Sequence, residues 1–399
     1  MTYVSELKSD YDFVIVGARC AGAATAMLLA KGGARVLAID RQCYGSDTLS
    51  THALMRPAVI QLKRWGLLDR IIAAGAPVVT LTTFHYGPEK VEVPIRAEPG
   101  LPGLVAPRRT LLDRMLVDAA RSAGATIVHD VVVQDLVSDS SGRIRQVVLK
   151  DVGGHSRTVS AGWVVGADGV GSLVARQAGA QTLVRGRTSA AHIYSYAEMP
   201  RMEGYHWYYD LGMGAAFIPT DGGLACVAVF VPTARYDAEI RLDIAGNRMK
   251  ILRSLDPGLA EHVAKNDRTP LRAFRGTPGH LRQAFGAGWV LVGDAGFFRD
   301  PITSHGISDA LRDAEGAADA LLAGSEAARR RYQQERDEIV LPILEATDAI
   351  ATFDGTLDEL PARHRRFSEA MKPETAVLAA REERCTRSPR DQTPLAQTA

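Results

Sequence analysis

A glycine-containing loop near the start of the 399-residue chain has the residue types and spacing of a phosphate-binding turn. Its residues are Gly17, Ala18, Arg19, Cys20, Ala21 and Gly22. The loop joins an apolar run at 13–16, typical of a buried strand, to a segment at 21–31 whose Ala, Leu and Met residues favour a helix. Backbone N–H groups at such a helix start, together with the helix dipole, can hold a pyrophosphate.

Residues around this loop complete the pattern of a dinucleotide site. Asp40 closes the second predicted strand, at 34–39, and is placed to accept hydroxyls of an adenosine ribose. Arg41 follows it, and either covers the adenine or lies exposed. Arg19 stands where a middle glycine is usual, so we expect its side chain to point away or to bind the phosphate itself. A single loop of this kind also occurs as an ordinary tight turn.

Two later segments combine glycine and aspartate directly after apolar runs. The first is 166–172, with Arg176 after it, and the second is 293–296, which continues into 300–310. Each follows a run of the buried-strand type. The sequence contains no recognisable catalytic triad, metal-spaced histidine cluster or paired acid–base carboxylates. That pattern favours a cofactor as the source of the chemistry.

Taken together, the three motifs resemble the flavoprotein monooxygenase family, the single-component FAD-dependent aromatic hydroxylases related to p-hydroxybenzoate hydroxylase. The glycine loop, the Asp-Gly motif and the Gly-Asp motif occur in the family's order and span 13–310. The resemblance implies an α/β fold with a Rossmann-like FAD-binding domain, an inserted antiparallel β-sheet substrate domain and a helical C-terminal region. It also implies FAD as the cofactor and NAD(P)H as the reductant.

The resemblance assigns flavin contacts to the last motif. Asp294, after Gly293, is expected to accept a hydrogen bond from a ribitol hydroxyl of FAD. The loop that begins at Pro301 and ends at Gly306 leads into a helix at Ile307. Backbone amides there can face the pyrimidine edge of the flavin, where negative charge develops on reduction.

Other cofactor contacts follow from the first two motifs and from a helix start between them. Asp168 and Gly169 are similar to family residues near the FAD pyrophosphate and NAD(P)H, and their alternative is a plain strand-terminal turn. Arg109 resembles a family residue before a helix whose side chain reaches the FAD chain. Its alternative is a solvated arginine.

His192, Tyr194 and Tyr196 alternate along one predicted strand, so they share one face of it. Tyr205, Trp207 and Tyr209 likewise share one face of a second predicted strand. Such a sheet can roof the isoalloxazine ring, although core packing is the alternative for any single aromatic. The segment 217–219 resembles the family segment that enters the pocket beside the flavin. The expected pocket residues are His52, Tyr194, Tyr196, Trp207, Phe217, Pro301 and His305.

Hydrophobic periodicity and turn residues predict the helices and strands that position these residues. Helices are expected at 57–74, 111–123, 308–323 and, with a break near Gly355, 327–371. Strands are expected at 126–137, 144–149, 163–166 and 289–292, and antiparallel strands at 192–197, 205–211, 215–219 and 224–231. The expected domains are FAD-binding (1–75, 103–180 and 272–325), substrate-binding β (76–102 and 181–271), C-terminal helices (326–380) and a flexible tail (381–399).

Composition excludes several classes of protein. With 47 Lys+Arg against 46 Asp+Glu, the chain lacks the cationic field of a nucleic-acid binder. Its four cysteines form no Cys-x-x-Cys pair, so neither a disulfide framework nor a zinc site is expected. No apolar run is long enough to span a bilayer, and 1–12 has no signal-peptide core. We therefore expect a cytoplasmic protein without membrane contact.

The function that best fits the sequence is an FAD-dependent monooxygenase. It would hydroxylate or epoxidise an aromatic or polyketide-like small molecule through a flavin C4a-hydroperoxide, using NAD(P)H and dioxygen. A flavin-dependent halogenase is one alternative, because Phe298, Pro301, Ser304 and Gly306 match a spacing of that branch. However, the chain has no Trp-x-Trp-x-Ile-Pro run, and 45–55 contains no lysine.

Two other functions remain open. One is a flavin-dependent reductase or dehydrogenase of an isoprenoid or polyketide double bond. The other is a non-catalytic flavin-binding protein, which the intact 294–306 loop disfavours. A homodimer or a separate flavin reductase is a possible partner arrangement.

Overall fold

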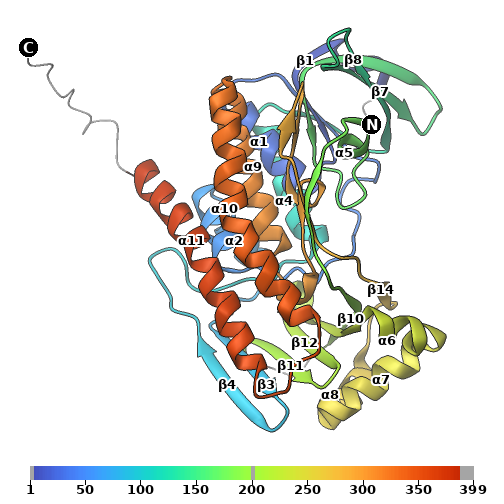
Figure 1. Cartoon of the computed structure of the whole chain (residues 1–399), viewed down its shortest axis with the longest axis vertical. Coiled ribbons are helices and arrows are strands. Elements are labelled where there is room, and N and C mark those ends of the chain that lie inside the picture. The colour runs from blue at the N-terminus through green and yellow to red at the C-terminus, as the bar shows by residue number, and fades with distance from the viewer. Residues whose placement is uncertain (1–3, 199–202, 387–399) are drawn as a thin grey trace, which may run out of the picture.

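Two large β-sheets, with helices packed against them, organise the chain (Figure 1). The computed structural model describes residues 4–198 and 203–386. The first sheet carries the glycine loop, the second lies below it in Figure 1, and three short strands from distant parts of the chain form a small third sheet. The predicted fold class, a Rossmann-like domain with an inserted β-sheet domain and C-terminal helices, is confirmed.

The first sheet has eight strands. They are β1 (Asp10–Val16), β2 (Val36–Ile39), β5 (Thr126–Val128), β6 (Val131–Ser138), β7 (Ile144–Asp151), β8 (Ser156–Gly166), β16 (Phe285–Gly286) and β17 (Trp289–Leu291). Parallel strands in the order β17-β8-β1-β2-β5 form its centre, and β6 and β7 form an antiparallel hairpin. Phe13 and Ile15 pack into one apolar layer and Val14 and Val16 into another, so β1 is buried on both faces.

Helices from distant parts of the chain cover this sheet. They are α1 (Cys20–Lys31), α2 (Arg56–Arg64), α3 (Leu68–Ala73), α4 (Arg109–Ser122), α5 (Leu173–Gln177) and α9 (Gly306–Leu322). The single helix predicted at 57–74 is wrong, because Gly66 takes a φ of +72° and ends the first helix. The strand predicted at 126–137 is likewise two strands, separated at Asp130, whose φ is +59°.

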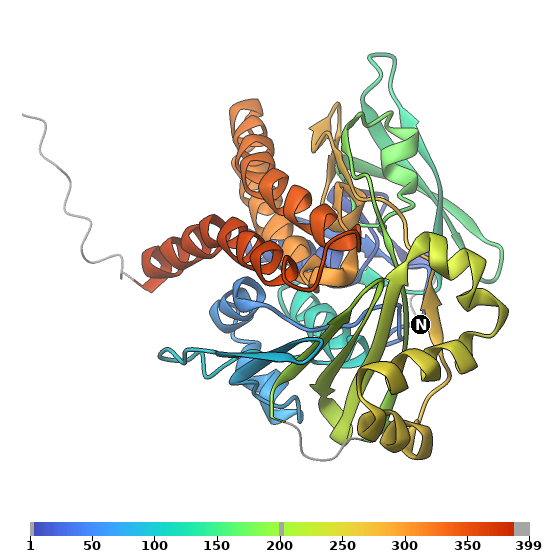
Figure 2. The same cartoon turned by 60° about the horizontal axis from the view of Figure 1, so that its bottom comes forward.

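The second sheet has seven strands. They are β3 (Leu81–Tyr86), β4 (Glu89–Pro94), β10 (Ala190–Glu198), β11 (Tyr205–Asp210), β12 (Met213–Thr220), β13 (Leu224–Pro232) and β14 (Arg272–Phe274). The antiparallel pairing predicted for β10 to β13 is confirmed, whereas β3 pairs parallel to β11. One face of this sheet packs against α6 (Thr233–Ala238), α7 (Ile244–Leu255) and α8 (Pro257–Asn266) (Figure 2).

The other, inner face of the second sheet packs on the half of the chain that contains the first sheet, in one continuous apolar cluster with α1, α2, α4 and α9. Several short strands pair across the domain boundaries expected from the sequence. β9 (Thr182–Arg185) joins β15 (His280–Arg282) and β18 (Phe297–Phe298), while β14 belongs to the second sheet. Pairing between distant short strands leaves no local mark in a sequence, so these edges were not predictable.

Two long helices complete the fold, α10 (Glu326–Ala351) and α11 (Leu360–Thr386), which lie side by side (Figure 1). Helix α11 continues beyond 380, so the tail expected from 381 begins as helix. The remainder of that expected tail, 387–399, lies outside the described residues. Across the described ranges, no helix combines the length and apolarity needed to cross a membrane.

Helix α11 contacts both halves of the molecule. Its His364 Nδ1 lies 2.9 Å from the Tyr86 hydroxyl of the second sheet, and the His364 ring packs 4.6 Å from that of Tyr209. Its Leu378 carbonyl accepts a hydrogen bond from Arg64 of α2 at 3.3 Å. The helix therefore connects the second sheet to the half of the chain that contains the first sheet.

Candidate cofactor site and active site

The three sequence motifs meet at the carboxyl ends of the parallel strands. A Cβ on Gly17 would lie 2.3 Å from the carbonyl oxygen of Ala167, and one on Gly22 would lie 1.8 Å from the Gly17 oxygen. A Cβ on Gly293 would lie 2.9 Å from the Cβ of Ala21. Only glycine fits these contacts, so the glycine loop, the Asp-Gly turn and the Gly-Asp turn are held against one another.

Asp294 lies in the turn η4 (Gly293–Ala295), half-buried, and no described residue donates a hydrogen bond to its carboxylate. Burial raises the pKa of this carboxyl to about 7, while the nearby guanidinium of Arg109 opposes the rise. A Cβ on Gly306 would lie 4.0 Å from Asp294 Oδ1, so the carboxylate is next to the start of α9. A partly buried acceptor without a protein donor suits a ligand hydroxyl.

Two helices begin at this place without a side-chain cap. Neither α1, whose N-cap is Arg19, nor α9, whose N-cap is His305, has a capping hydrogen bond from that side chain. Their first-turn amides and dipoles favour a negatively charged or acceptor group. With the Asp294 acceptor between them, this donor and acceptor set fits the pyrophosphate, ribitol and pyrimidine groups of FAD.

Asp113 of α4 joins the glycine loop to Arg109. Arg109, the first residue of α4, donates to both Asp113 oxygens at 2.9 and 3.1 Å. Arg19 reaches Asp113 at 3.0 Å and the Ser46 carbonyl at 3.1 Å, so its side chain points away from the loop, the first of the two arrangements expected. Cys20 Sγ also donates to Asp113, at 3.1 Å. Sequence reasoning missed Asp113, although its i, i+4 spacing from Arg109 was visible.

Asp40 is buried at the end of β2, and its carboxylate accepts hydrogen bonds from the amides of Ala18 and Gln42, each at 2.9 Å. It therefore fixes the glycine loop, and each oxygen keeps a lone pair for a ribose hydroxyl. The Arg41 side chain that follows it is exposed.

Asp168 instead supports the alternative reading of its motif. Its carboxylate accepts from Ser172 Oγ at 2.5 Å and from the amides of Leu173 and Val174 at 2.6 and 3.2 Å. These bonds cap the start of α5, so the side chain serves the turn itself. Gly169 has a φ of +79°, which the turn requires.

Aromatic side chains gather on the inner face of the second sheet. Those in the cluster shared with the FAD-binding domain are Tyr86, Tyr194, Tyr196, Tyr205, Trp207, Tyr209 and Phe230. Phe217 is not among them: it packs with Tyr208 (ring centroids 5.5 Å apart) in the cluster that includes α7 and α8. Its neighbours Ala216 and Ile218 face inward, so strand alternation turns Phe217 outward, and its expected place in the pocket is wrong.

His52 lies against this inner face from the FAD-binding side. Its ring stacks on Tyr196, with centroids 5.6 Å and planes 16° apart, and its Nδ1 is 3.2 Å from the Ala106 carbonyl. Burial lowers its pKa to about 3, helped by the positive charge of Arg108, so the ring is neutral. Tyr194 of the same strand accepts a hydrogen bond from the Ser50 amide at 3.0 Å.

The loop before α9 is tied to β10. Asp300 accepts hydrogen bonds from the amide of Ala190 at 2.6 Å and lies 3.2 Å from His192 Nε2. It also caps the short turn η5 (Pro301–Thr303). Pro301 thus lies in the expected loop between the two domains, and Ser304, with a φ of +50°, redirects the chain into α9.

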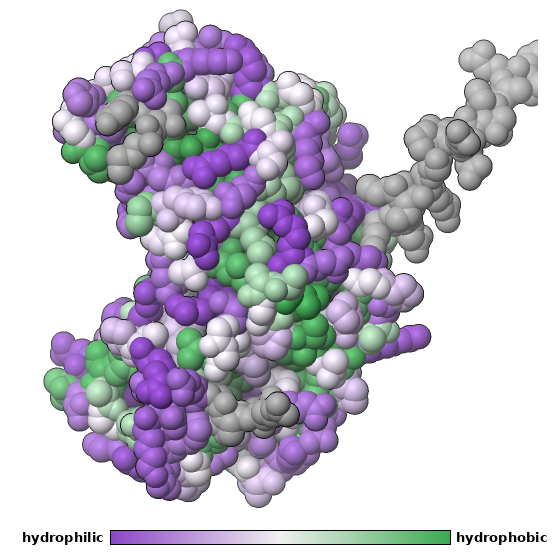
Figure 3. All heavy atoms as spheres, turned by 180° about the vertical axis from the view of Figure 1, so that it is seen from behind, coloured by the Kyte–Doolittle hydropathy of each residue, from purple (hydrophilic) through white to green (hydrophobic). Residues whose placement is uncertain are grey.

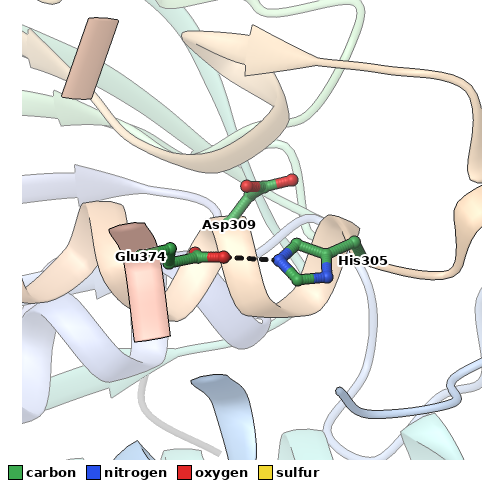
Figure 4. A group of neighbouring side chains, drawn as sticks. All are labelled: His305, Asp309 and Glu374. Carbon is green, nitrogen blue, oxygen red and sulfur yellow. Dashed lines mark hydrogen bonds and ion pairs between the residues drawn. The ribbon is translucent and has the colours of Figure 1, made fainter. Parts of the chain in front are cut away.

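His305 has a different environment from the one expected (Figure 4). Its Nε2 lies 2.6 Å from Glu374 of α11, and its side chain is fully buried there, so it faces α11 and not the aromatic sheet. His305, Asp309 and Glu374 could in principle ligate a metal. However, Asp309 pairs with Arg299 (2.8 Å) and Arg312 (2.7 Å), and Arg312 also reaches Glu374 at 2.7 Å. Because two guanidinium groups already neutralise both carboxylates, we interpret the cluster as an ion-pair network.

The fold and this site define a flavoprotein with a Rossmann-like FAD-binding domain and a separate substrate domain. A sequence model described as an FAD binding domain matches residues 10–347, and the chain belongs to that family. It is therefore an FAD-dependent oxidoreductase.

Individual relatives differ in chemistry. A menaquinone reductase of Mycolicibacterium smegmatis is 30% identical over 335 residues, which cover 78% of this chain and 76% of that one. The structure of p-nitrophenol 4-monooxygenase PnpA from Pseudomonas putida has a TM-score of 0.77 at 20% identity, covering 96% of this chain and 100% of that one. That of the flavin-dependent brominase Bmp2 has a TM-score of 0.74 at 18% identity, covering 95% and 99%. The two structures share the fold with this chain.

Proposed function

We propose that the protein is an FAD-dependent monooxygenase that hydroxylates or epoxidises an aromatic or polyketide-like small molecule, with NAD(P)H as reductant and dioxygen as oxidant. The observation that carries this proposal is the inner sheet face, where aromatic side chains from β10 and β11 pack toward the FAD-binding domain. Such a lining suits a planar apolar ligand and excludes water from the reacting atoms.

The cofactor roles follow from the site. The start of α1 would hold the pyrophosphate of FAD, and Asp294 would accept a ribitol hydroxyl. The start of α9 would place positive dipole charge at the pyrimidine edge of the flavin. Bound there, FAD would supply the activation of dioxygen, while the chain orients the substrate and keeps the site dry.

Isotope labelling tests the proposal. The protein, purified with FAD, is mixed with NADH or NADPH and a panel of phenols and naphthols under ¹⁸O₂, and products are read by mass spectrometry. We expect nucleotide-dependent bleaching of the flavin and one ¹⁸O atom in the product. Products without label from dioxygen, or a flavin that neither nucleotide reduces, would contradict the proposal.

A reductase of an isoprenoid double bond is the second candidate, and the observation that favours it is the menaquinone reductase relative. The same preparation, reduced with dithionite without oxygen and given menaquinone, separates the two. A product that has gained two hydrogens would identify the reductase. For the halogenase alternative, the matching observation would be a chloride-dependent product that contains chlorine.

A further inference from the structure

Three buried polar atoms without a hydrogen-bond partner belong to Tyr196 and to the two side chains that pack on its ring. They are His52 Nε2, Tyr196 Oη and Arg108 Nε. The His52 ring stacks on Tyr196, and the Arg108 guanidinium lies 4.4 Å from the Tyr196 ring centroid. A buried polar atom left unpaired costs about 1–3 kcal/mol, so three together point to a bound group that pairs with them.

The chemistry of the three atoms is complementary. His52 Nδ1 faces the Ala106 carbonyl and so carries the ring proton, which leaves a lone pair on Nε2. Tyr196 supplies a hydroxyl, which can donate, and Arg108 supplies a charged N–H donor. The set therefore offers one acceptor and two donors.

His52 is also held in an unfavourable backbone conformation. Its φ is +46°, in the left-handed region that only a few per cent of residues other than glycine adopt. Its amide donates to Ser50 Oγ at 3.2 Å, and its ring bonds to Ala106 from the segment before α4. Strain of this kind persists where surrounding contacts enforce it and is often found at ligand sites.

The position of the group relates it to the cofactor site. His52 and Arg108 belong to the FAD-binding half, whereas Tyr196 lies on β10 of the sheet domain. Arg108 directly precedes Arg109, whose charge acts on Asp294. The three atoms thus lie where the two domains meet, next to the residues that fit FAD.

We propose that His52, Tyr196 and Arg108 form the subsite that recognises a phenolic or enolic hydroxyl on the substrate; this rests on the proposed function and names the substrate class. A hydroxyl donates to His52 Nε2 and accepts from Tyr196, which a methyl ether cannot do in full. A carboxylate offers no proton to Nε2. The Arg108 charge stabilises the negative charge that the hydroxyl oxygen gains as the ring becomes more nucleophilic.

Binding of three probes to the oxidised, FAD-loaded protein tests the subsite without turnover. The probes are 2-naphthol, 2-methoxynaphthalene and 2-naphthoate, and binding is measured by the change in flavin absorbance and by calorimetry. We expect 2-naphthol to bind about 10- to 100-fold more tightly than the ether or the carboxylate. Tyr196→Phe and His52→Asn should each reduce this preference to about threefold or less, and asparagine tolerates the left-handed backbone.

Tyr194→Phe is the matched control. Its hydroxyl lies on the same strand face but already bonds to the Ser50 amide and, at 3.3 Å, to the Thr48 carbonyl. We expect this variant to be less stable and to keep the preference for 2-naphthol. By contrast, Tyr196→Phe should not lower the unfolding free energy of the FAD-free protein, because the buried hydroxyl that it removes has no protein partner.

Three results would overturn the subsite: equal binding of 2-naphthol and its ether, binding of none of the probes, or an unchanged preference in Tyr196→Phe. The outcome is separable from the proposed function. A hydroxyl preference without ¹⁸O incorporation removes the monooxygenase and keeps the subsite. Oxygenation of substrates with no preference for a hydroxyl keeps the monooxygenase and removes the subsite.

Discussion

Replacing Gly22 by alanine should weaken FAD binding more than it lowers stability. The added Cβ would lie 1.8 Å from the Gly17 oxygen, about 1.6 Å closer than an ordinary contact of 3.4 Å. Free protein can relieve this overlap by moving the loop, but the bound state requires the loop in its original position. Overlap of this kind costs about 1–3 kcal/mol, which is about a 5- to 150-fold increase in the Kd for FAD.

The assay is quenching of FAD fluorescence on titration with FAD-free protein, alongside urea unfolding of each variant. Gly33→Ala is the control at the other end of the same helix: Gly33 has a φ of +85°, but nothing lies within 4 Å of its Cβ position. It should lose about 1–2 kcal/mol of stability and keep its FAD affinity. Wild-type affinity in Gly22→Ala, or an equal loss in Gly33→Ala, would refute the reasoning.

Three other outcomes follow from the site. Asp294→Asn should bind FAD about tenfold more weakly. The pKa of the Asp294 carboxyl is about 7 in the folded protein and 3.8 in the unfolded chain, so the unfolding free energy of the wild type falls as pH rises between these values, by up to about 1.4 kcal/mol per pH unit. Urea midpoints of FAD-free Asp294→Asn should lack this fall. Glu374→Gln should lower the unfolding free energy measured in urea by about 3–5 kcal/mol, whereas the exposed control Glu326→Gln should lower it by less than about 1 kcal/mol. Equal losses in the two variants would contradict the buried ion-pair network. EDTA should change neither FAD content nor melting temperature, whereas a loss restored by zinc would mean that the His305 cluster holds a metal.

The parts of the site that were predictable are those set by local backbone geometry. The glycine turns and the strands before them follow from short apolar runs and from positions where no side chain fits, so Gly17, Gly22 and Gly293 were found from sequence. Asp294, which directly follows Gly293, was assigned to the flavin by resemblance, and that role stays a prediction. Alternation along β11 also placed Trp207 correctly on the inner face.

Contacts between distant residues were not predictable in the same way. Glu374 lies 69 residues from His305, and nothing in either segment marks the pair. Phe217 was assigned by resemblance, but the pleat of β12 decides its direction, and that depends on which face the FAD-binding domain covers. Asp168 was predicted to lie near the cofactor, but its carboxylate caps the start of α5. An Asp-Gly pair occurs at both kinds of position, so the sequence alone could not distinguish them.

The surface between the FAD-binding half and the sheet domain is hollowed on the face seen in Figure 3, between the end that carries β7 and the end that carries α6 to α8. Helix α11 lies elsewhere, and it fastens the two halves through His364, Glu374 and Leu378. Parting the halves would separate His364 from Tyr86 and would expose the apolar cluster that the inner face of the second sheet shares with α1, α2, α4 and α9, so burial of that surface favours the closed arrangement. Substrate and product should therefore exchange by local rearrangement of side chains and loops, with the domains remaining closed throughout turnover.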